Sequence, residues 1–355
     1  MFLAWNEIKK NKLRFILITG VLMLVAYLVF FLSGLATGLA NLNRESVDKW
    51  NANGIILTED SDKSIYQSSM TLDVLDDVTA DDMAVLGQIN AIANNGNNKK
   101  NISLFGINKE EFIMPTVTEG KPFSNENEVI ANDSLKDEGF KLGDEISLSS
   151  SEVKLIIVGF TDNAKFNASP VLYADLTTFH NVRYGEAADL NKDQINGVVL
   201  KTNDLSKVNL DSELEVIEIE EFISNLPGYT EQKLTLNFMI YFLFIISAVI
   251  VSIFLYVLTV QKISMFGVMK AQGISNLYLS QSVIAQTFIL SAVGIIIGFI
   301  LTVITGSFLP SAVPVAFDYG IMMIYGAILI LVAILGAVFS VSTIVKVDPL
   351  KAIGG

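Results

Sequence analysis

Few residues of this chain could carry covalent or acid–base chemistry. Cysteine is absent, and His180 in LTTFHNVRY is the single histidine among 355 residues. A serine–histidine or cysteine–histidine nucleophile pair would rest on His180 alone, and an ordinary surface or half-buried histidine is the better interpretation. The acidic stretch EVIEIEEF, residues 215–222, is typical of a solvated strand face or edge. The sequence therefore predicts no hydrolytic site.

Charge, motifs and composition argue against a nucleic-acid-binding protein, an ATPase and a soluble enzyme. The formal net charge is −13, whereas nucleic-acid binding requires clustered cations that release counterions. The chain contains no GxxxxGK[ST] phosphate-binding loop, so we do not expect it to hydrolyse ATP by itself. No EF-hand spacing predicts a metal site. Hydrophobic residues make up 51% of the chain and charged residues 17%, which is outside the usual range of a soluble enzyme.

Four stretches without charged residues predict membrane-spanning helices. They contain 29, 28, 47 and 27 residues, and each holds more than the roughly 20 apolar residues that cross a bilayer as a helix. Because the first is too long for a signal peptide and has no small-residue cleavage site, we expect it to be retained as an anchor. The predicted spans are residues 15–40, 236–260, 281–309 and 319–345.

Basic residues flank the predicted spans on one side of the membrane, and such residues mark the cytoplasmic side. We therefore expect a multi-pass protein of the bacterial cell membrane with residues 1–14, 261–280 and 346–355 inside and 41–235 outside. Residues 1–14 would form an amphipathic helix on the inner membrane surface, or act only as a topology signal. The basic residues concerned are Lys9, Lys10, Lys12, Arg14, Lys262, Lys270, Lys346 and Lys351.

Residues 41–235 are predicted to fold as one α+β domain. They hold 34 of the 37 acidic residues but 16 of the 24 basic ones. Helices are expected at 79–86 and 176–182, and an exposed loop at 90–101. The predicted fold class is therefore four transmembrane helices with a large extracellular α+β domain inserted between the first and the second. The β-rich runs begin at residues 54, 101, 128, 144, 153, 197 and 214.

Three stretches of the chain resemble a known family. FGVMKAQGIS, residues 266–275, is similar to the segment after the second span in the FtsX-like permeases of ABC transporters, the MacB or type VII architecture. The passage EGKPFSNENEVIANDSLKDEGFKLGDEISL resembles part of that family's outer domain, and VDPLKAIGG resembles its C-terminal ending. Many members carry an acidic residue before the Gly-Val pair, where this chain has Met265 and Phe266. Within the family, the chain looks most like the HrtB-like haem-efflux permeases of Gram-positive bacteria.

The resemblance implies a permease that is not itself an enzyme. It would form a homodimer, associate with two copies of a separate ATPase subunit that binds ATP and Mg²⁺, and expel haem or a similar amphiphile from the membrane. Spans without internal charges suit an amphiphile that enters from the lipid better than an ion path. Two alternatives stay open. One is an FtsX-like mechanotransmission protein that controls an extracellular partner such as a cell-wall hydrolase, and the other is a peptide or antibiotic efflux permease with an adaptor.

The resemblance also assigns a role to the segment between the second and third spans, which would be the coupling element held by the ATPase. Its apolar side chains would anchor it, its lysine would face an acidic partner, and its glycines would permit turns or close backbone approach. The alternative is an ordinary loop with a glycine cap and a topology signal. The residues concerned are Phe266, Gly267, Val268, Met269, Lys270 and Gly273.

Candidate substrate and dimer contacts complete the expectations. Haem would need an iron ligand and a flat apolar slot. The aromatic residues among the substrate candidates have an alternative interpretation, as membrane-interface anchors or as ordinary domain packing. Gly34 and Gly38 in the first span are assigned to a dimer contact, and Gly294 and Gly298 in the third to internal packing, because such spacing lets helices approach closely. The substrate candidates are Trp50, Tyr66, Met70, Tyr173, Tyr184, Tyr229 and Met239.

Overall fold

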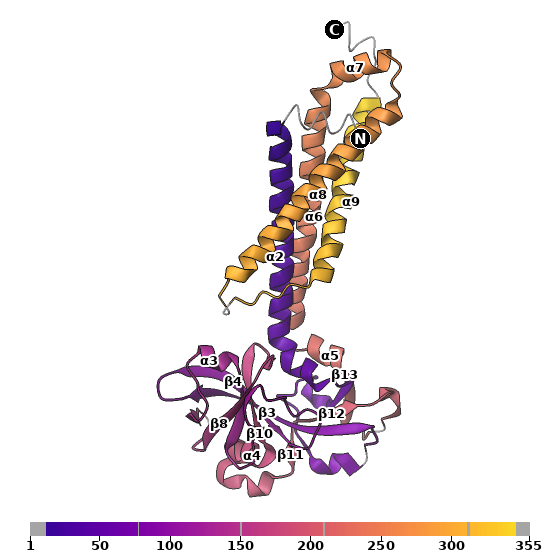
Figure 1. Cartoon of the computed structure of the whole chain (residues 1–355). Coiled ribbons are helices and arrows are strands. Elements are labelled where there is room, and N and C mark those ends of the chain that lie inside the picture. The colour runs from indigo at the N-terminus through magenta and orange to yellow at the C-terminus, as the bar shows by residue number, and fades with distance from the viewer. Residues whose placement is uncertain (1–11, 77, 150, 209, 311–312, 346–355) are drawn as a thin grey trace. The chain divides into compact units, whose positions relative to one another are not determined.

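The computed structural model describes residues 12–76, 78–149, 151–208, 210–310 and 313–345 (Figure 1). The expectations for residues 1–11 and for the tail 346–355 lie outside these ranges. The chain divides into two compact units. One comprises Met1–Gly38 and Lys233–Gly355, and the other is Leu39–Gln232.

Four helices of the described chain are long and apolar enough to cross a membrane. In hydrocarbon every backbone N–H and C=O group must be paired within the segment, so these long apolar runs fold as helices. Figure 1 shows the four side by side, with the short helix α7 (Ile263–Ala271) close to one end. The four predicted spans are confirmed. They are α2 (Lys12–Trp50), α6 (Tyr229–Val260), α8 (Asn276–Phe308) and α9 (Tyr319–Val345).

Glycines of α8 bring that helix against the backbone of α2. A Cβ atom on Gly294 would lie 3.0 Å from the carbonyl oxygen of Thr19, and one on Gly298 would lie 2.8 Å from that of Met23. Without side chains at these two positions, the helices pack closely enough to gain van der Waals contact in the absence of a hydrophobic driving force. The prediction of internal packing for Gly294 and Gly298 is confirmed.

The two glycines of α2 that were assigned to a dimer contact also pack internally. Gly34 lies against the ring of Phe317, and Gly38 lies against the backbone of Pro314. The amide of Ala316 donates a hydrogen bond of 3.0 Å to the carbonyl oxygen of Gly34. Within this chain, the segment before α9 thus lies against Gly34 and Gly38, and the assignment of these two glycines to a dimer contact stays a prediction.

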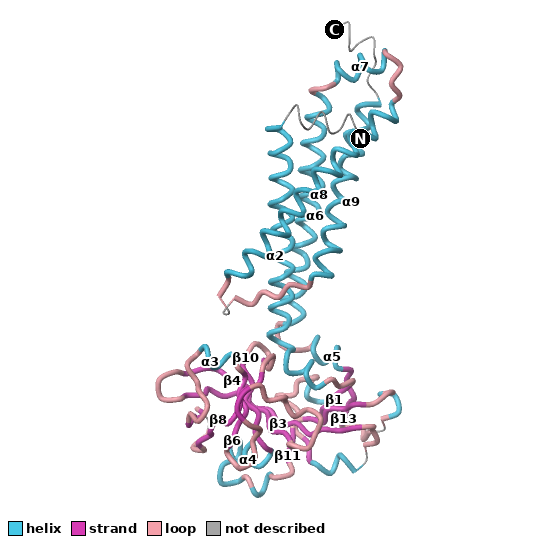
Figure 2. Tube along the Cα trace, viewed as in Figure 1, coloured by secondary structure: helices cyan, strands magenta, loops and turns pink. Residues whose placement is uncertain are grey.

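The second unit is an α+β domain inserted between the first two spans, as predicted. Figure 2 shows its strands gathered together. In the described residues eleven strands form one sheet, with the order β13-β1-β12-β3-β4-β10-β6-β8-β5; β7 pairs with β3 and β8, and β9 with β10. The pairs β4–β10 and β6–β8 are parallel, and the others are antiparallel. The strands are β1 (Gly54–Thr58), β3 (Asp82–Asn94), β4 (Lys99–Ile107), β5 (Glu119–Gly120), β6 (Glu128–Asn132), β7 (Glu145–Leu148), β8 (Lys154–Thr161), β9 (Lys165–Phe166), β10 (Ser169–Asp175), β12 (Gly197–Lys201) and β13 (Leu214–Glu218), with β2 (Met70–Thr71) and β11 (Gln194–Ile195) forming a separate pair.

All seven β-rich runs of the sequence are strands, but two local predictions were wrong. Residues 79–86 do not form a helix, because β3 begins at Asp82 and pairs with both β12 and β4 in the middle of the sheet. Residues 90–101 are not a loop, because β3 continues to Asn94 and turns back into β4 at Lys99. Pairing on both edges decides the conformation of such a central strand more than local propensity does.

Three helices accompany the sheet: α3 (Ser134–Asp137), α4 (Leu176–Tyr184) and α5 (Ile219–Ser224). The helix predicted at 176–182 is α4. It begins where the sequence provides a cap, since the amide of Thr178 donates to the carboxylate of Asp175 at 2.6 Å, and it ends at Gly185 with a positive φ of 55°. The sheet and α5 enclose a core around Trp50, from the last turn of α2.

Candidate functional site

The segment between the second and third spans is a short helix with a buried side and an exposed side. Phe266 of α7 is only 3% exposed and packs against Leu279 and Val283 of α8. Phe266 therefore fixes α7 to the bundle instead of offering its ring to a partner, which corrects the expectation of an apolar anchor at that residue. Gly267, beside it, is also buried.

The exposed side of α7 carries the apolar side chains of Met265 and Val268, with exposed fractions of 39% and 44%. Met269 is half-buried and packs on the Phe266 cluster. Burial lowers the pKa of the Lys270 ammonium group. Val268 was among the predicted contact residues and Met265 was not. The exposed side of α7 is therefore formed by Met265 and Val268, whereas the predicted contact surface also included the buried Phe266.

Backbone geometry sets the direction in which the chain leaves α7. Gly273 adopts a φ of +89°, a conformation that residues with a side chain rarely take. Ser275 then caps α8, since its hydroxyl accepts a hydrogen bond of 3.3 Å from the amide of Tyr278. The predicted turn at Gly273 is therefore present. Together with the cap at Ser275, it sets the angle between α7 and the start of α8.

A second cluster of functional interest lies at the end of α2, within the α+β domain. Arg44 donates to both carboxylate oxygens of Asp48 and, through Nη2, to Glu220 of α5 at 2.6 Å. Its Nη1 also lies 3.4 Å from the hydroxyl of Tyr229, the first residue of α6. One guanidinium group therefore joins the helix that enters the domain to the two helices through which the chain leaves it.

Lys49 makes a second connection from the same helix. Its Nζ donates to the carboxylate of Asp162 at 2.7 Å and to the hydroxyl of Thr161 at 3.0 Å. This contact lowers the pKa of the Asp162 carboxyl group. Sequence reasoning assigned no role to Arg44 or Lys49, although a basic residue directly after an apolar span and another five residues later on the same helix were a usable signal.

The residues proposed to contact substrate do not form a binding slot. Trp50, Tyr173 and Tyr229 are each less than 5% exposed and belong to one closed core cluster of the domain. The ring of Tyr173 meets Phe105 edge to face at 5.7 Å, and burial raises the pKa of its phenol well above the ordinary range. Trp50 is thus a core residue and not a membrane-interface side chain, which corrects that expectation.

The remaining candidates lie in other places. Met70 is buried in a different core cluster, Tyr66 is 61% exposed on the domain surface, and Met239 is exposed on α6 of the helical unit. Tyr184 stacks on His180 with ring centroids 6.2 Å apart. His180 is buried, and its Nε2 lies 2.7 Å from the carbonyl oxygen of Gln194, as befits a structural histidine.

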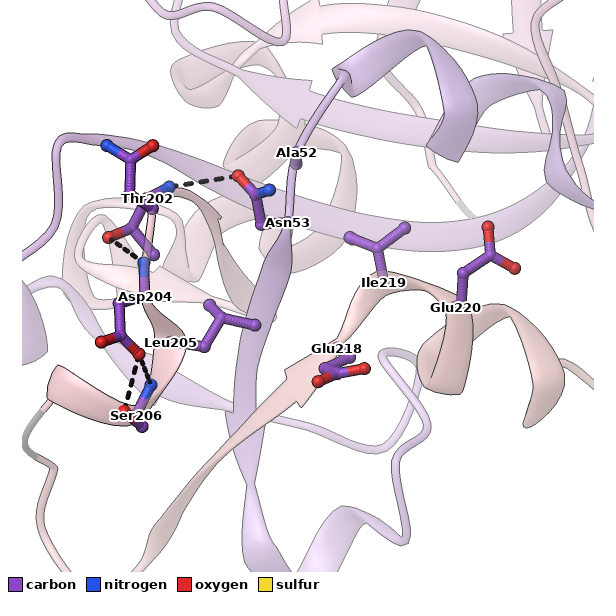
Figure 3. A pocket seen from close by; sticks show the side chains of 10 residues that line it. Ala52, Asn53, Thr202, Asp204, Leu205, Ser206, Glu218, Ile219 and Glu220 are labelled. Atoms are coloured by element: carbon purple, nitrogen blue, oxygen red, sulfur yellow. Dashed lines mark hydrogen bonds between the residues drawn. The ribbon is translucent and has the colours of Figure 1, made fainter.

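A polar pocket of about 530 Å³ lies beside β12 and β13 of the α+β domain (Figure 3). The hydroxyl and amide of Ser206 donate to Asp204 at 2.6 and 3.1 Å and lower the pKa of that carboxyl group. Glu218 and Glu220 also line the pocket. Its acidic lining is unsuited to an anionic amphiphile. Across the described ranges, no three histidine, aspartate or glutamate side chains are placed to hold a metal ion.

Comparison with known families places this architecture. The model of the MacB-like periplasmic core domain matches residues 15–211, and that of the FtsX-like permease C-terminal domain matches residues 237–349. The chain belongs to this family of FtsX-like and MacB-like ABC transporter permeases. Members of the family are membrane permeases that work with an ATPase subunit and are not enzymes themselves.

The chain is similar over its whole length to particular permeases. It is 28% identical to the hemin transport system permease protein HrtB of Staphylococcus epidermidis and 26% identical to that of Staphylococcus haemolyticus, over 100% of this chain and 99% of each relative. An ABC transporter permease of Mycobacterium tuberculosis is 21% identical over the same shares. Among solved structures, the extracellular domain of the noncanonic ABC-type transporter YknZ covers 47% of this chain at 13% identity, with a TM-score of 0.33, and 100% of its own chain.

Proposed function

We propose that this chain is the permease subunit of a homodimeric ABC efflux transporter that uses ATP hydrolysis by two copies of a separate ATPase to expel haem or a similar amphiphile from the membrane. Both termini and α7 would face the cytoplasm, and the α+β domain would lie outside, as the distribution of basic residues indicates. ATP and Mg²⁺ would bind to the partner subunit. This chain would hold haem only as cargo.

The observation that carries the proposal is the construction of α7. A helix of nine residues between two spans is fixed to the bundle by Phe266 and leaves Met265 and Val268 exposed. Apolar side chains outside the bilayer core gain free energy when another protein covers them. Because α7 is continuous with α6 and α8 through short connections, a partner that moves α7 would also move these helices.

Haem is proposed as cargo because of the full-length similarity to permeases named for hemin transport. The spans agree with cargo of this kind, because no charged residue lies between Arg14 and Arg44 or between Lys270 and Asp318. An amphiphile can reach such helices from the lipid, whereas an ion path usually requires an intramembrane charge.

Mechanotransmission to an extracellular partner is the second candidate. It is favoured by the contacts of Arg44 and Lys49, which tie the end of α2 to three separate segments of the α+β domain. It is favoured also by the closed core around Trp50 and Tyr173, which leaves no room for cargo. In this version the domain would transmit a movement of α2 to a protein bound outside.

One titration separates the two candidates. Haem is added to the detergent-solubilised permease with its ATPase, and the Soret absorbance and the ATP hydrolysis rate are followed together. Efflux predicts a saturable spectrum and a changed rate of ATP hydrolysis over the same range of haem concentration. An active basal ATPase that responds to neither haem nor a panel of amphiphiles would contradict efflux and favour mechanotransmission.

A further inference from the structure

An apolar groove runs between α2 and α8 within the helical unit. Its volume is about 650 Å³, within the range of roughly 300–1,000 Å³ that holds small ligands. Phe15 and Gly20 line it from α2, and Leu290 and Ile297 line it from α8. Among the described residues that line it, Lys12 alone is charged.

The groove arises from the way in which the two helices cross. They touch at Gly294 and Gly298, where added Cβ atoms would collide with the backbone of α2. On the neighbouring face of α2, by contrast, a Cβ atom on Gly20 would meet nothing within 4 Å. The helices approach closely at Gly294 and Gly298 and leave open space at Gly20. The groove is this open space, which a larger residue at position 20 would fill.

Lys12 lines the groove at the end where α2 begins, and two further basic residues lie near this end without lining the groove. Arg14 Nη1 donates to the side-chain oxygen of Gln261 at 2.5 Å, and Lys262 Nζ lies 5.7 Å from the centroid of the Phe15 ring. Apart from Lys12, the lining residues within the described ranges are uncharged. The groove thus combines an apolar body with a lysine at the end of the bundle, where lysine and arginine reach the lipid headgroups.

We propose that this groove binds an anionic phospholipid of the surrounding bilayer, with one acyl chain between α2 and α8 and the phosphate held by Lys12. Basic pockets between membrane helices bind acidic headgroups by the same complementarity. A second copy of this chain is a poorer occupant, because a two-fold contact at this groove would bring Lys12 against the Lys12 of the other copy. Lying beside the α2–α8 crossing, the lipid would stabilise the angle between these helices, one of which, α8, follows the segment that the ATPase is proposed to move.

The site can be mapped in the full-length chain. The protein is reconstituted in nanodiscs that contain phosphatidylglycerol carrying a photoreactive acyl chain, irradiated, and digested for mass spectrometry. Labelling is expected on peptides that contain Gly20 and Val293, and unlabelled phosphatidylglycerol should compete for it while phosphatidylcholine should not. Equal competition by the two lipids would overturn the proposal, because it would mean ordinary contact with the bilayer.

Two substitutions sharpen the test. Gly20→Leu fills the groove and should abolish the labelling, while Leu24→Phe, which adds bulk on an exposed part of the same helix, should leave it unchanged. Lys12→Gln should lower the preference for phosphatidylglycerol about fivefold, which corresponds to about 1 kcal/mol per basic residue near a membrane surface. Should Gly20→Leu misfold, Gly20→Ala narrows the groove without loss of helix propensity and should reduce labelling partly.

Haem provides a further discriminating measurement, because it is also an anionic amphiphile. If haem displaces the photoreactive lipid and unlabelled phosphatidylglycerol does not, the groove is a cargo site and the lipid assignment is wrong. If phosphatidylglycerol displaces the probe and haem does not, the lipid site stands whether or not the protein exports haem. Unchanged labelling in Gly20→Leu would contradict both the lipid site and the cargo site, because neither ligand would then occupy the groove.

Discussion

Arg44 Nη2 lies 2.6 Å from Glu220 Oε1 and so connects the end of α2 to α5. The two side chains are 20% and 71% exposed, and an ion pair with that much solvent contributes at most about 1 kcal/mol to stability. Arg44 nevertheless also reaches Tyr229, where α6 begins. We therefore interpret the cluster as a mechanical connection between α2 and α6 more than as a source of folding free energy.

Replacement of Arg44 tests this interpretation. Arg44→Met should lower the free energy of unfolding by no more than about 1 kcal/mol, yet it should uncouple cargo release from ATP hydrolysis, because α2 loses the contacts that Arg44 makes with α5 and with the start of α6. The measurements are thermal unfolding in detergent and the amount of cargo released per ATP hydrolysed. Lys100→Met, which removes the exposed ion pair with Glu138, is the matched control and should leave this ratio unchanged. Equal ratios in both variants would exclude a mechanical role for Arg44.

The exposed side of α7 gives a second prediction. Val268→Asp places a charge on the exposed side of the helix and should weaken binding of the ATPase at least about tenfold, as loss of an apolar contact residue at an interface does. Phe266→Ala should act differently and destabilise the packing of α7 on α8 by about 3 kcal/mol. Co-purification at defined ATPase concentrations and thermal unfolding separate the two effects. Leu190→Asp, at an 88% exposed residue of the α+β domain, is the control for added charge.

A pattern of apolar runs was sufficient to predict most of the fold. The four spans follow from charge-free stretches that have no alternative structure in lipid, and the seven strands follow from short β-branched runs between turn residues. The helix predicted at 79–86 is wrong, because β3 begins at Asp82. In the folded domain this strand pairs with β12 and β4, and that long-range pairing is invisible in a local window.

The sequence predicted the position of the segment between the second and third spans but not which side chains it exposes. The pattern of 266–275 could not tell that Phe266 packs on α8 and that Val268 is exposed, since this depends on the angle at which α7 leaves α6. Trp50 was expected at the membrane interface because it follows the first span. The helix instead continues into the domain core and carries Trp50 with it.

Acidity should act on the domain through Glu128. Its carboxylate accepts hydrogen bonds from the amides of Ser124 at 2.8 Å and Asn125 at 3.1 Å, and these contacts lower its pKa to about 2. Because the pKa of Glu128 is lower in the folded protein than in the unfolded chain, where it is about 4.3, the carboxylate stabilises the fold fully above about pH 4.3. This stabilisation is lost as the pH falls towards about 2.

Glu128→Gln should therefore cost about 1–2 kcal/mol at neutral pH and flatten the stability curve between pH 4 and 2. Hydrogen exchange of the β6 amides in the full-length protein measures both effects. The exposed neighbour Glu126, changed to glutamine, is the control and should retain the parent curve. An unchanged slope in Glu128→Gln would mean that this carboxylate does not hold its loop.

The α2–α8 crossing allows a matched pair of glycine substitutions. Gly298→Ala would push a methyl group to within 2.8 Å of the carbonyl oxygen of Met23 and should destabilise the helical unit by about 1–3 kcal/mol. Gly20→Ala on α2 meets open space and should be neutral or stabilise by up to about 1 kcal/mol through helix propensity. Thermal inactivation in detergent ranks the two, and equal effects would contradict the close contact.

In the proposed function, ATP hydrolysis by the partner subunit drives haem or a related amphiphile out of the membrane through this permease. The most direct test loads haem into proteoliposomes that contain the complex and follows its transfer to an apo acceptor protein in the solution on the α+β side. The account predicts transfer that is faster with ATP and Mg²⁺ than with a non-hydrolysable analogue, and that is lost in Val268→Asp. Transfer at the same rate with and without hydrolysis, in vesicles whose ATPase is active, would contradict it.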